Sequence, residues 1–251
     1  MGKSLIEIAK AVIQTEADSV LLLKDRIDQK FDEICNLIRF CKGKVILVGM
    51  GKSGHIAKKI ASTLASTGTP SFYLHPGEAG HGDLGMINSN DVVIMISYSG
   101  ESDEIISLLP GIKRIHTPII SMTGNINSTL AMASEFHLDV SVNKEACPNN
   151  LAPTSSTTAA LVMGDAIAVS LMSVNNFTSE DFAMSHPSGT LGRRLLTLVS
   201  SIMKEGLDIP IVSKETLLID SLLVMTKKSL GMVIIAEDEK LIGIFTDGDL
   251  R

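Results

Sequence analysis

A glycine-rich segment that carries a lysine and a serine follows an apolar run near residue 45. It reads Val45-Ile-Leu-Val-Gly-Met-Gly-Lys-Ser-Gly54, so Lys52 and Ser53 stand where a buried strand would turn into a helix. Glycines allow a sharp turn there, and the first turn of a helix offers unpaired N–H groups to an anion. The segment predicts a phosphate site that includes Gly51, Lys52 and Ser53.

The spacing of the glycines separates three kinds of phosphate ligand. A nucleoside triphosphate loop needs a glycine at position 46, which is Ile46, so that ligand is excluded. The glycines at 49, 51 and 54 match a dinucleotide motif, but the next apolar run ends in His75-Pro76 and not in an acidic residue. We therefore favour a phosphorylated small molecule, with a dinucleotide as the alternative.

Two further hydroxyl-rich segments lie before expected helices. One is Ser97-Tyr-Ser-Gly-Glu-Ser-Asp-Glu104, and the other is Pro153-Thr-Ser-Ser-Thr-Thr158, which precedes an apolar helix expected over 159–172. A plain helix cap needs one hydroxyl, whereas several hydroxyls around a glycine favour an anion nest. The predicted substrate-binding residues are Gly51, Ser53, Ser97, Ser99, Gly100, Glu101, Thr154, Ser155, Ser156 and Thr157.

Five short apolar runs must position these segments. They cover residues 44–48, 71–74, 92–97, 118–123 and 136–140, and helical stretches separate them. This alternation predicts an α/β fold with a parallel sheet and helices on both faces, in which ligands bind beyond the carboxyl ends of the strands. Apolar residues at helical spacing predict two amphipathic helices over 6–41, interrupted near 24–26, which could cover the sheet or pair with another subunit.

Composition excludes several other classes of protein. The 251 residues are 45% hydrophobic, and a net charge of -6 with scattered basic residues argues against nucleic-acid partners. No secretory leader and no apolar run of about 20 residues is evident, so we expect a cytoplasmic protein without a membrane span. Cys35, Cys41 and Cys147 are read as buried free thiols, because their number and spacing fit neither a disulfide frame nor a structural zinc site.

The ordered set of motifs resembles the sugar isomerase (SIS) domain and, within it, the arabinose 5-phosphate isomerases. The likeness spans residues 1–251 and rests on the segments 49–54, 77–85, 97–102, 152–158 and 186–189. It implies a SIS domain over 1–196 with a doubly wound five-stranded parallel sheet flanked by helices. Tyr98 departs from the asparagine that is more usual in the family, a change that a side chain pointing away from the ligand could tolerate.

Residues 202–251 resemble the first of two CBS repeats, without the second repeat of the pair. A single repeat leaves an apolar sheet face uncovered. We therefore expect this partial CBS domain to pack on another subunit, or the chain to be a shortened form.

The resemblance implies interconversion of D-ribulose 5-phosphate and D-arabinose 5-phosphate through an enediolate, without a cofactor, for the synthesis of Kdo and lipopolysaccharide. The implied reacting residues are Lys52, His81, Glu104, Glu145 and His186. We interpret Glu104 and Glu145 as proton carriers, because burial in a crevice moves the pKa of a carboxylate toward neutrality. We interpret His81 as an imidazole that opens the sugar ring or moves a proton between its oxygens. The alternatives are a first-turn helix acid for Glu104, a solvated loop acid for Glu145 and an inhibitory metal site at His75 and His81.

The resemblance also implies a homotetramer with sites between subunits, and His186 would reach across such a boundary. The rival hypothesis is a non-catalytic phosphosugar sensor on the same fold. The two hypotheses share the binding loops and differ only in whether the five reacting residues act on the bound sugar.

Overall fold

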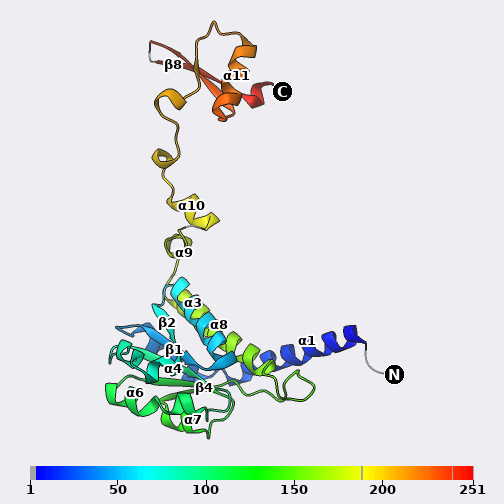
Figure 1. The fold of residues 1–251 in the computed structure, drawn as a ribbon, viewed down its shortest axis with the longest axis vertical. Coiled ribbons are helices and arrows are strands. Elements are labelled where there is room, and N and C mark those ends of the chain that lie inside the picture. The colour runs from blue at the N-terminus through cyan, green and yellow to red at the C-terminus, as the bar shows by residue number, and fades with distance from the viewer. Residues whose placement is uncertain (1–3, 188, 239, 251) are drawn as a thin grey trace. The chain divides into compact units, whose positions relative to one another are not determined.

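The computed structural model of the chain describes residues 4–187, 189–238 and 240–250. They form two compact units, Met1–Leu195 and Leu196–Arg251. In the first unit, helices cover both faces of a single parallel sheet (Figure 1). This unit contains every residue that the sequence analysis assigned to binding or reaction.

The sheet of the first unit has five parallel strands in the order β2-β1-β3-β4-β5. The strands are β1 (Val45–Gly49), β2 (Ser71–Leu74), β3 (Val92–Ile96), β4 (Ile119–Thr123) and β5 (Phe136–Asp139). They coincide with the five predicted runs to within one residue at each end, which confirms the doubly wound sheet. β2 lies on one side of β1, and the chain then crosses to the other side to form β3. The topological switch point therefore lies between β1 and β3.

Burial of the sheet on both faces explains why its central strands are continuous apolar runs. Successive side chains of a strand point to opposite faces, so Leu47 belongs to one hydrophobic core and Ile46 to the other. Both side chains are fully buried. If polar and apolar residues alternated along these strands, one of the two cores would have polar side chains where it now has apolar ones.

Two layers of helices complete these cores. One layer contains α2 (Gln29–Arg39), α3 (Gly51–Ser66) and α8 (Ser155–Val174), and the other contains α4 (Pro76–Gly80), α5 (Asp103–Ile106), α6 (Leu109–Ile115) and α7 (Thr129–Ala133). α1 (Leu5–Leu21) packs against α8 and extends away from the sheet (Figure 1). A short 3-10 helix, Leu22–Arg26, separates α1 from α2 at the predicted interruption.

Helix α8 corrects one expectation. It is long and apolar enough to cross a membrane by length and composition, and it is the only helix in the described part of the chain that meets this test. A core helix passes the same test, and α8 packs against α3 and α1 with Met163 and Ile167 buried. Its apolar residues therefore belong to the hydrophobic core that contains Leu47. Two short helices, α9 (Ser179–Ser185) and α10 (Thr190–Leu196), follow α8 in the chain.

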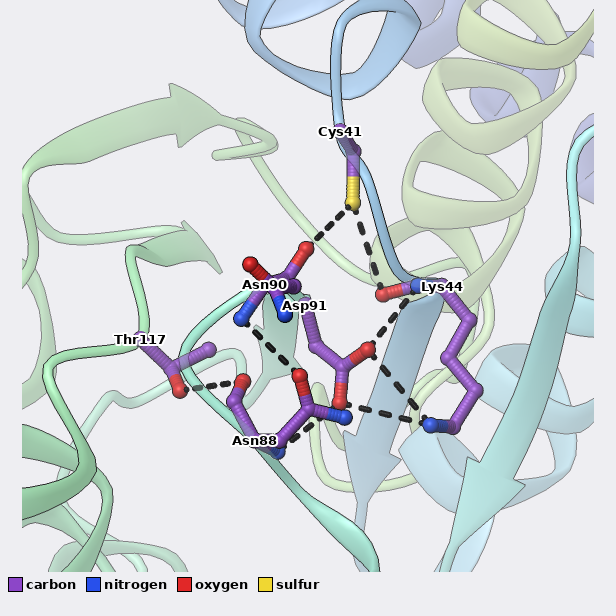
Figure 2. Close-up of polar contacts among 6 residues, drawn as sticks. All are labelled: Cys41, Lys44, Asn88, Asn90, Asp91 and Thr117. Atoms are coloured by element: carbon purple, nitrogen blue, oxygen red, sulfur yellow. Dashed lines mark hydrogen bonds and ion pairs between the residues drawn. The ribbon is translucent and has the colours of Figure 1, made fainter.

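A buried aspartate holds the amino edge of the sheet together (Figure 2). Asp91, directly before β3, is 1% exposed, and it accepts hydrogen bonds from the backbone N–H groups of Lys44 and Asn88, both at 2.9 Å. The Nζ atom of Lys44 lies 3.4 Å from the same carboxylate. Thr117, just before β4, donates to the Asn88 carbonyl at 3.0 Å. The starts of β1, β3 and β4 are thereby fixed relative to one another.

The cysteines are all free, but only Cys35 is buried, so the prediction of three buried thiols was wrong for Cys41 and Cys147. Burial raises the pKa of Cys35 to about 11. The Cys41 thiol lies beside the Asp91 cluster, where it contacts backbone carbonyls (Figure 2).

In its described residues, the second unit is a three-stranded sheet with one α-helix and short 3-10 helices. It comprises β6 (Ile211–Val212), α11 (Leu218–Lys228), β7 (Met232–Glu237) and β8 (Lys240–Thr246), with β6 parallel and β8 antiparallel to β7. Leu223 of α11 and Ile242 of β8 are 66% and 56% exposed. An apolar surface of this unit is thus uncovered, as a single repeat would leave it, and the CBS assignment stays a prediction.

Candidate active site at the carboxyl edge of the sheet

The glycine-rich segment forms the first part of the site. β1 ends at Gly49, and α3 begins at Gly51 behind Met50, whose side chain makes no capping hydrogen bond. The first N–H groups of α3 have no partner within the helix and point toward the edge where ligands of such sheets bind. Lys52 is exposed and Ser53 is half-buried in this first turn, as expected for residues that meet an anion.

The second part of the site follows β3, the neighbour of β1. Ser97 is 3% exposed, and its hydroxyl lies 2.9 Å from the Ser102 hydroxyl and accepts the Gly100 N–H at 3.2 Å. Ser99 is exposed and accepts the Glu101 N–H at 3.2 Å. Ser97 therefore shapes this turn from within, and Ser99 is the hydroxyl of the two that a ligand can reach.

Gly100 is required in this turn for two reasons. Its φ is +70°, a conformation that residues with a side chain rarely adopt, and a Cβ atom there would lie 2.1 Å from the Ser128 hydroxyl. The turn thus packs directly on the start of α7.

Glu101 serves the same contact. It was predicted to bind substrate, but its carboxylate accepts the Thr129 N–H at the start of α7, at 2.7 Å. This bond holds the pKa of Glu101 below its usual value. The observed contact of Glu101 is a helix cap.

The third part of the site is the start of α8, where Glu145 folds back. Its Oε2 atom accepts the Thr154 N–H at 2.7 Å, the Thr154 hydroxyl at 2.9 Å and the Ser156 N–H at 3.3 Å. Burial raises the pKa of Glu145, but the hydrogen bonds from Ser156 and Thr154 outweigh it, so the pKa lies below its usual value. The prediction of a pKa near neutrality was wrong for Glu145, because its carboxylate caps a helix.

The hydroxyls of residues 154–157 do not all face one space. The Thr154 hydroxyl donates to Glu145 and accepts the Ala146 N–H, and Ser155 is fully buried with no hydrogen-bond partner for its hydroxyl among the described residues. Ser156 and Thr157 instead line a cavity of about 40 Å³. Of the four predicted residues, these two share a space with the turn that follows β1.

This cavity lies over the carboxyl ends of β3 and β4, and most of its lining residues are apolar. Ser53 contributes from α3, Tyr98 from the turn after β3, and Ser156 and Thr157 from α8. The cavity is large enough for only a few water molecules, since each needs roughly 10–15 Å³. A phosphosugar must therefore extend beyond the cavity along the carboxyl edge.

Tyr98 also lines the cavity, although the sequence analysis did not assign it to the site. Its phenol oxygen accepts the Val142 N–H at 3.1 Å, and its ring lies against Gly124, where a Cβ atom would be 2.6 Å from a ring carbon. Sequence reasoning set this residue aside. The signal that could have found it is a large aromatic in a turn otherwise built of small residues.

The histidine-containing loop follows β2, on the other side of β1. His75 caps α4 by accepting the Gly77 N–H at 3.1 Å, and His81 is exposed at the end of that helix. In the part of the chain that the structure describes, no three His, Cys, Asp or Glu residues are grouped as a metal site requires. Exposure leaves the His81 imidazole available to a ligand at the carboxyl edge.

Glu104 and His186 end in different places. Glu104 is exposed in the first turn of α5, directly after the turn that follows β3. His186 lies beyond the end of α8, stacked on Phe182 with ring centroids 4.0 Å apart, and its Nδ1 atom is 3.1 Å from the Phe182 carbonyl. Because α8 starts at the carboxyl edge and is about 30 Å long, His186 lies at the opposite end of the unit from Glu145. Ser188 of the same motif is outside the described residues.

A larger hollow of about 490 Å³ lies on the other side of Glu145. It is bounded by Ile8 and Val12 of α1 and by Lys144 and Cys147 of the loop that precedes α8. The carboxylate of Glu145 thus stands between this hollow and the start of α8.

Comparison with known proteins decides the family. The SIS domain matches residues 38–170. The chain is 56% identical over all of its 251 residues to arabinose 5-phosphate isomerase KdsD of Escherichia coli K12, of which it covers 76%. The chain belongs to the SIS-domain arabinose 5-phosphate isomerase family. This finding confirms the resemblance that the motifs indicated.

Other members of the arabinose 5-phosphate isomerase family agree with this assignment. KdsD of Pseudomonas aeruginosa is 56% identical over 247 residues, which are 98% of this chain and 76% of that protein. Among solved structures, c3406 of E. coli CFT073, in complex with arabinose 5-phosphate, superimposes with a TM-score of 0.72 at 42% identity, over 74% of this chain and 100% of that one. The fold of the first unit is thus shared with a family member solved with a bound sugar phosphate.

Proposed function

We propose that this protein interconverts D-ribulose 5-phosphate and D-arabinose 5-phosphate through an enediolate. The observation that carries the proposal is the cavity near the carboxyl edge, whose lining includes Ser53 of α3 and both Ser156 and Thr157 of α8. Lys52 and Glu104 lie on the same edge of the sheet. Identity of 56% to curated arabinose 5-phosphate isomerases names the sugar.

The phosphate of the sugar would bind between the turns that follow β1 and β3. The first N–H groups of α3 supply donors, Lys52 supplies a positive charge, and Ser53 and Ser99 supply hydroxyls. Ser97 and Gly100 give this turn its shape. These groups bind the end of the sugar that does not react, which leaves the carbonyl end free to lie along the edge.

Proton transfer at C1 and C2 would fall to Glu104, which is exposed and makes no side-chain hydrogen bond in the described part of the chain that would compete with a substrate. His81, also exposed, would move the proton between the two oxygens. Glu145 fits a third role, because its ionised carboxylate is already committed to α8. We assign it to holding the start of α8 against the sugar. This scheme uses no metal and no redox cofactor.

His186 would act in a neighbouring copy. It lies at the far end of α8 from the other four residues, so a site that includes it needs a second chain. Exposed apolar residues on α1, including Ile6 at 69% and Ile13 at 69%, are surface that such an assembly could cover. We therefore propose the homotetramer that the resemblance implied.

The remaining assignments are proposals of the same kind. We propose a cytoplasmic enzyme that supplies the five-carbon precursor of Kdo for lipopolysaccharide, without nucleic-acid or membrane partners. Three free cysteines support a reducing compartment. Residues 202–251 would be the first repeat of a CBS pair, following a SIS domain over 1–196.

The first experiment incubates the protein with D-ribulose 5-phosphate in deuterated water and follows the sugars by NMR. We expect arabinose 5-phosphate that carries deuterium at C2. Binding of the sugar without product and without exchange at C1 or C2 would refute the isomerase and leave the non-catalytic sensor.

Matched variants then test the two exposed residues. We expect Glu104→Gln and His81→Asn to lower kcat by about a hundredfold, in the range of general acid–base catalysis, with phosphosugar binding retained. Glu33→Gln on α2 and His116→Asn after α6 are the controls, because both residues are exposed and lie at the amino edge of the sheet. Unchanged kcat in Glu104→Gln or in His81→Asn would remove that residue from the proton path.

A further inference from the structure

Tyr98 makes contacts to two other strand ends besides its own. Its backbone carbonyl accepts the Gly124 N–H at 2.8 Å, directly after β4. Its phenol oxygen accepts the Val142 N–H at 3.1 Å and lies 3.5 Å from the Val142 carbonyl, after β5. One residue therefore links the turns that follow β3, β4 and β5.

The linked segments carry different parts of the site. Tyr98 is flanked by Ser97 and Ser99 in the turn assigned to phosphate, and Val142 is three residues before Glu145 in the loop that leads to α8. The Glu145 carboxylate in turn binds the first N–H groups of α8. Hydrogen bonds at Tyr98 and at Glu145, joined by the chain over 142–145, thus connect the turn after β3 to the start of α8.

The ring of Tyr98 also forms part of the cavity wall. It faces the space that Ser53 and Thr157 share, and it lies over Gly124, where any side chain would collide with it. The tyrosine is 37% exposed, so it is open to solvent as well as to the cavity. Packing against a backbone glycine fixes the plane of the ring, since no side chain separates the two.

We propose that Tyr98 is a positioning residue that sets the separation between the phosphate turn and the start of α8. This inference rests on the proposed function and adds a residue to its site. The hydroxyl is the part that fixes the distance, and the ring is the part that borders the ligand. Without the hydroxyl, the phosphate turn keeps its own internal bonds, while the 142–145 loop loses its tie to that turn.

The test is Tyr98→Phe, which keeps the ring and removes the hydroxyl. We expect kcat for D-ribulose 5-phosphate to fall about tenfold while the affinity for inorganic phosphate stays within about twofold, because misplacing one wall affects the reacting end more than the phosphate end. The Val142 amide, followed by hydrogen exchange, should lose protection about fivefold, as expected for loss of one hydrogen bond.

The control is Tyr73→Phe, at the only other tyrosine of the chain. The Tyr73 hydroxyl also bonds to the backbone, at the Gly49 carbonyl 2.9 Å away, but Tyr73 does not line the cavity. Because Gly49 begins the glycine-rich segment, the readout of this control is the Val142 amide and not kcat. We expect this variant to lose similar thermal stability without faster exchange at Val142. Faster exchange at Val142 in Tyr73→Phe, equal to that in Tyr98→Phe, would show that loss of either tyrosine hydroxyl loosens this loop, and it would overturn the inference.

Two further outcomes are decisive. Wild-type kcat in Tyr98→Phe, whether or not Val142 exchanges faster, overturns the inference and leaves the isomerase intact. Absence of turnover in the wild-type protein overturns the proposed function itself, and the inference with it.

Discussion

Replacement of Asp91 by asparagine should destabilise the first unit far more than an equivalent change on its surface. Asp91 lies at the amino edge of the sheet, away from the proposed site, with its side chain fully buried. Its two oxygens accept the N–H groups of Lys44 and Asn88 at 2.9 Å each. Asparagine keeps the shape of the side chain but turns one acceptor into a donor that faces an N–H group.

The magnitude follows from these contacts. Hydrogen bonds to a charged group contribute about 1.5–3 kcal/mol each, and one of the two is lost while its N–H stays buried without an acceptor. The Lys44 side chain is one-third exposed and its ammonium can turn to water, so the ion pair adds little. We expect a loss of about 2–4 kcal/mol, a large part of the roughly 5–15 kcal/mol that folded domains have.

Urea unfolding followed by tyrosine fluorescence measures this loss in the first unit alone. Tyr73 and Tyr98 both lie in that unit, and the chain has no tryptophan. The control is Asp165→Asn, which breaks an ion pair with Lys59 whose two side chains are 44% and 41% exposed, and should cost less than about 1 kcal/mol. A midpoint for Asp91→Asn equal to that of Asp165→Asn would refute the reasoning.

Three further predictions concern other parts of the first unit. Gly100→Ala should cost about 2 kcal/mol or more in the same urea assay, because φ is +70° and the new Cβ meets Ser128; a wild-type midpoint would contradict the turn. The Glu145 carboxylate has a depressed pKa in the folded state, so its stabilisation is complete above the ordinary value of 4.5 and is lost as pH falls through the lower folded pKa. The stability gap between wild type and Glu145→Gln should therefore shrink from about pH 6 to pH 3, and a constant gap would contradict the cap. Backbone N–H groups of the residues that follow Cys147 lower its pKa, whereas burial raises the pKa of Cys35 to about 11. A thiol reagent should therefore label Cys147 first and Cys35 only on unfolding, as followed by mass spectrometry.

The sequence by itself determined the local elements and the class of ligand. Strands buried on both faces must be apolar along their length, and so the five runs could be placed to within one residue. The glycine-rich segment at Lys52 was equally local, because a glycine-rich turn and the start of a helix are adjacent in the chain. The family could be recognised for the same reason, since its motifs are short and their order is visible in one dimension.

Only the tertiary structure decided which side chains are committed to other contacts. Glu145 and Glu101 cap the starts of α8 and α7, and these partners depend on which segments meet at the carboxyl edge. Tyr98 reaches Val142 because β3, β4 and β5 are neighbours in the sheet, a contact across 44 residues that no periodicity records. His186 is separated from the other reacting residues by the length of α8, which the order of motifs along the chain does not show. A hydrogen-bond partner is a property of distance in space, and spacing in sequence specifies it only within a turn or a helix.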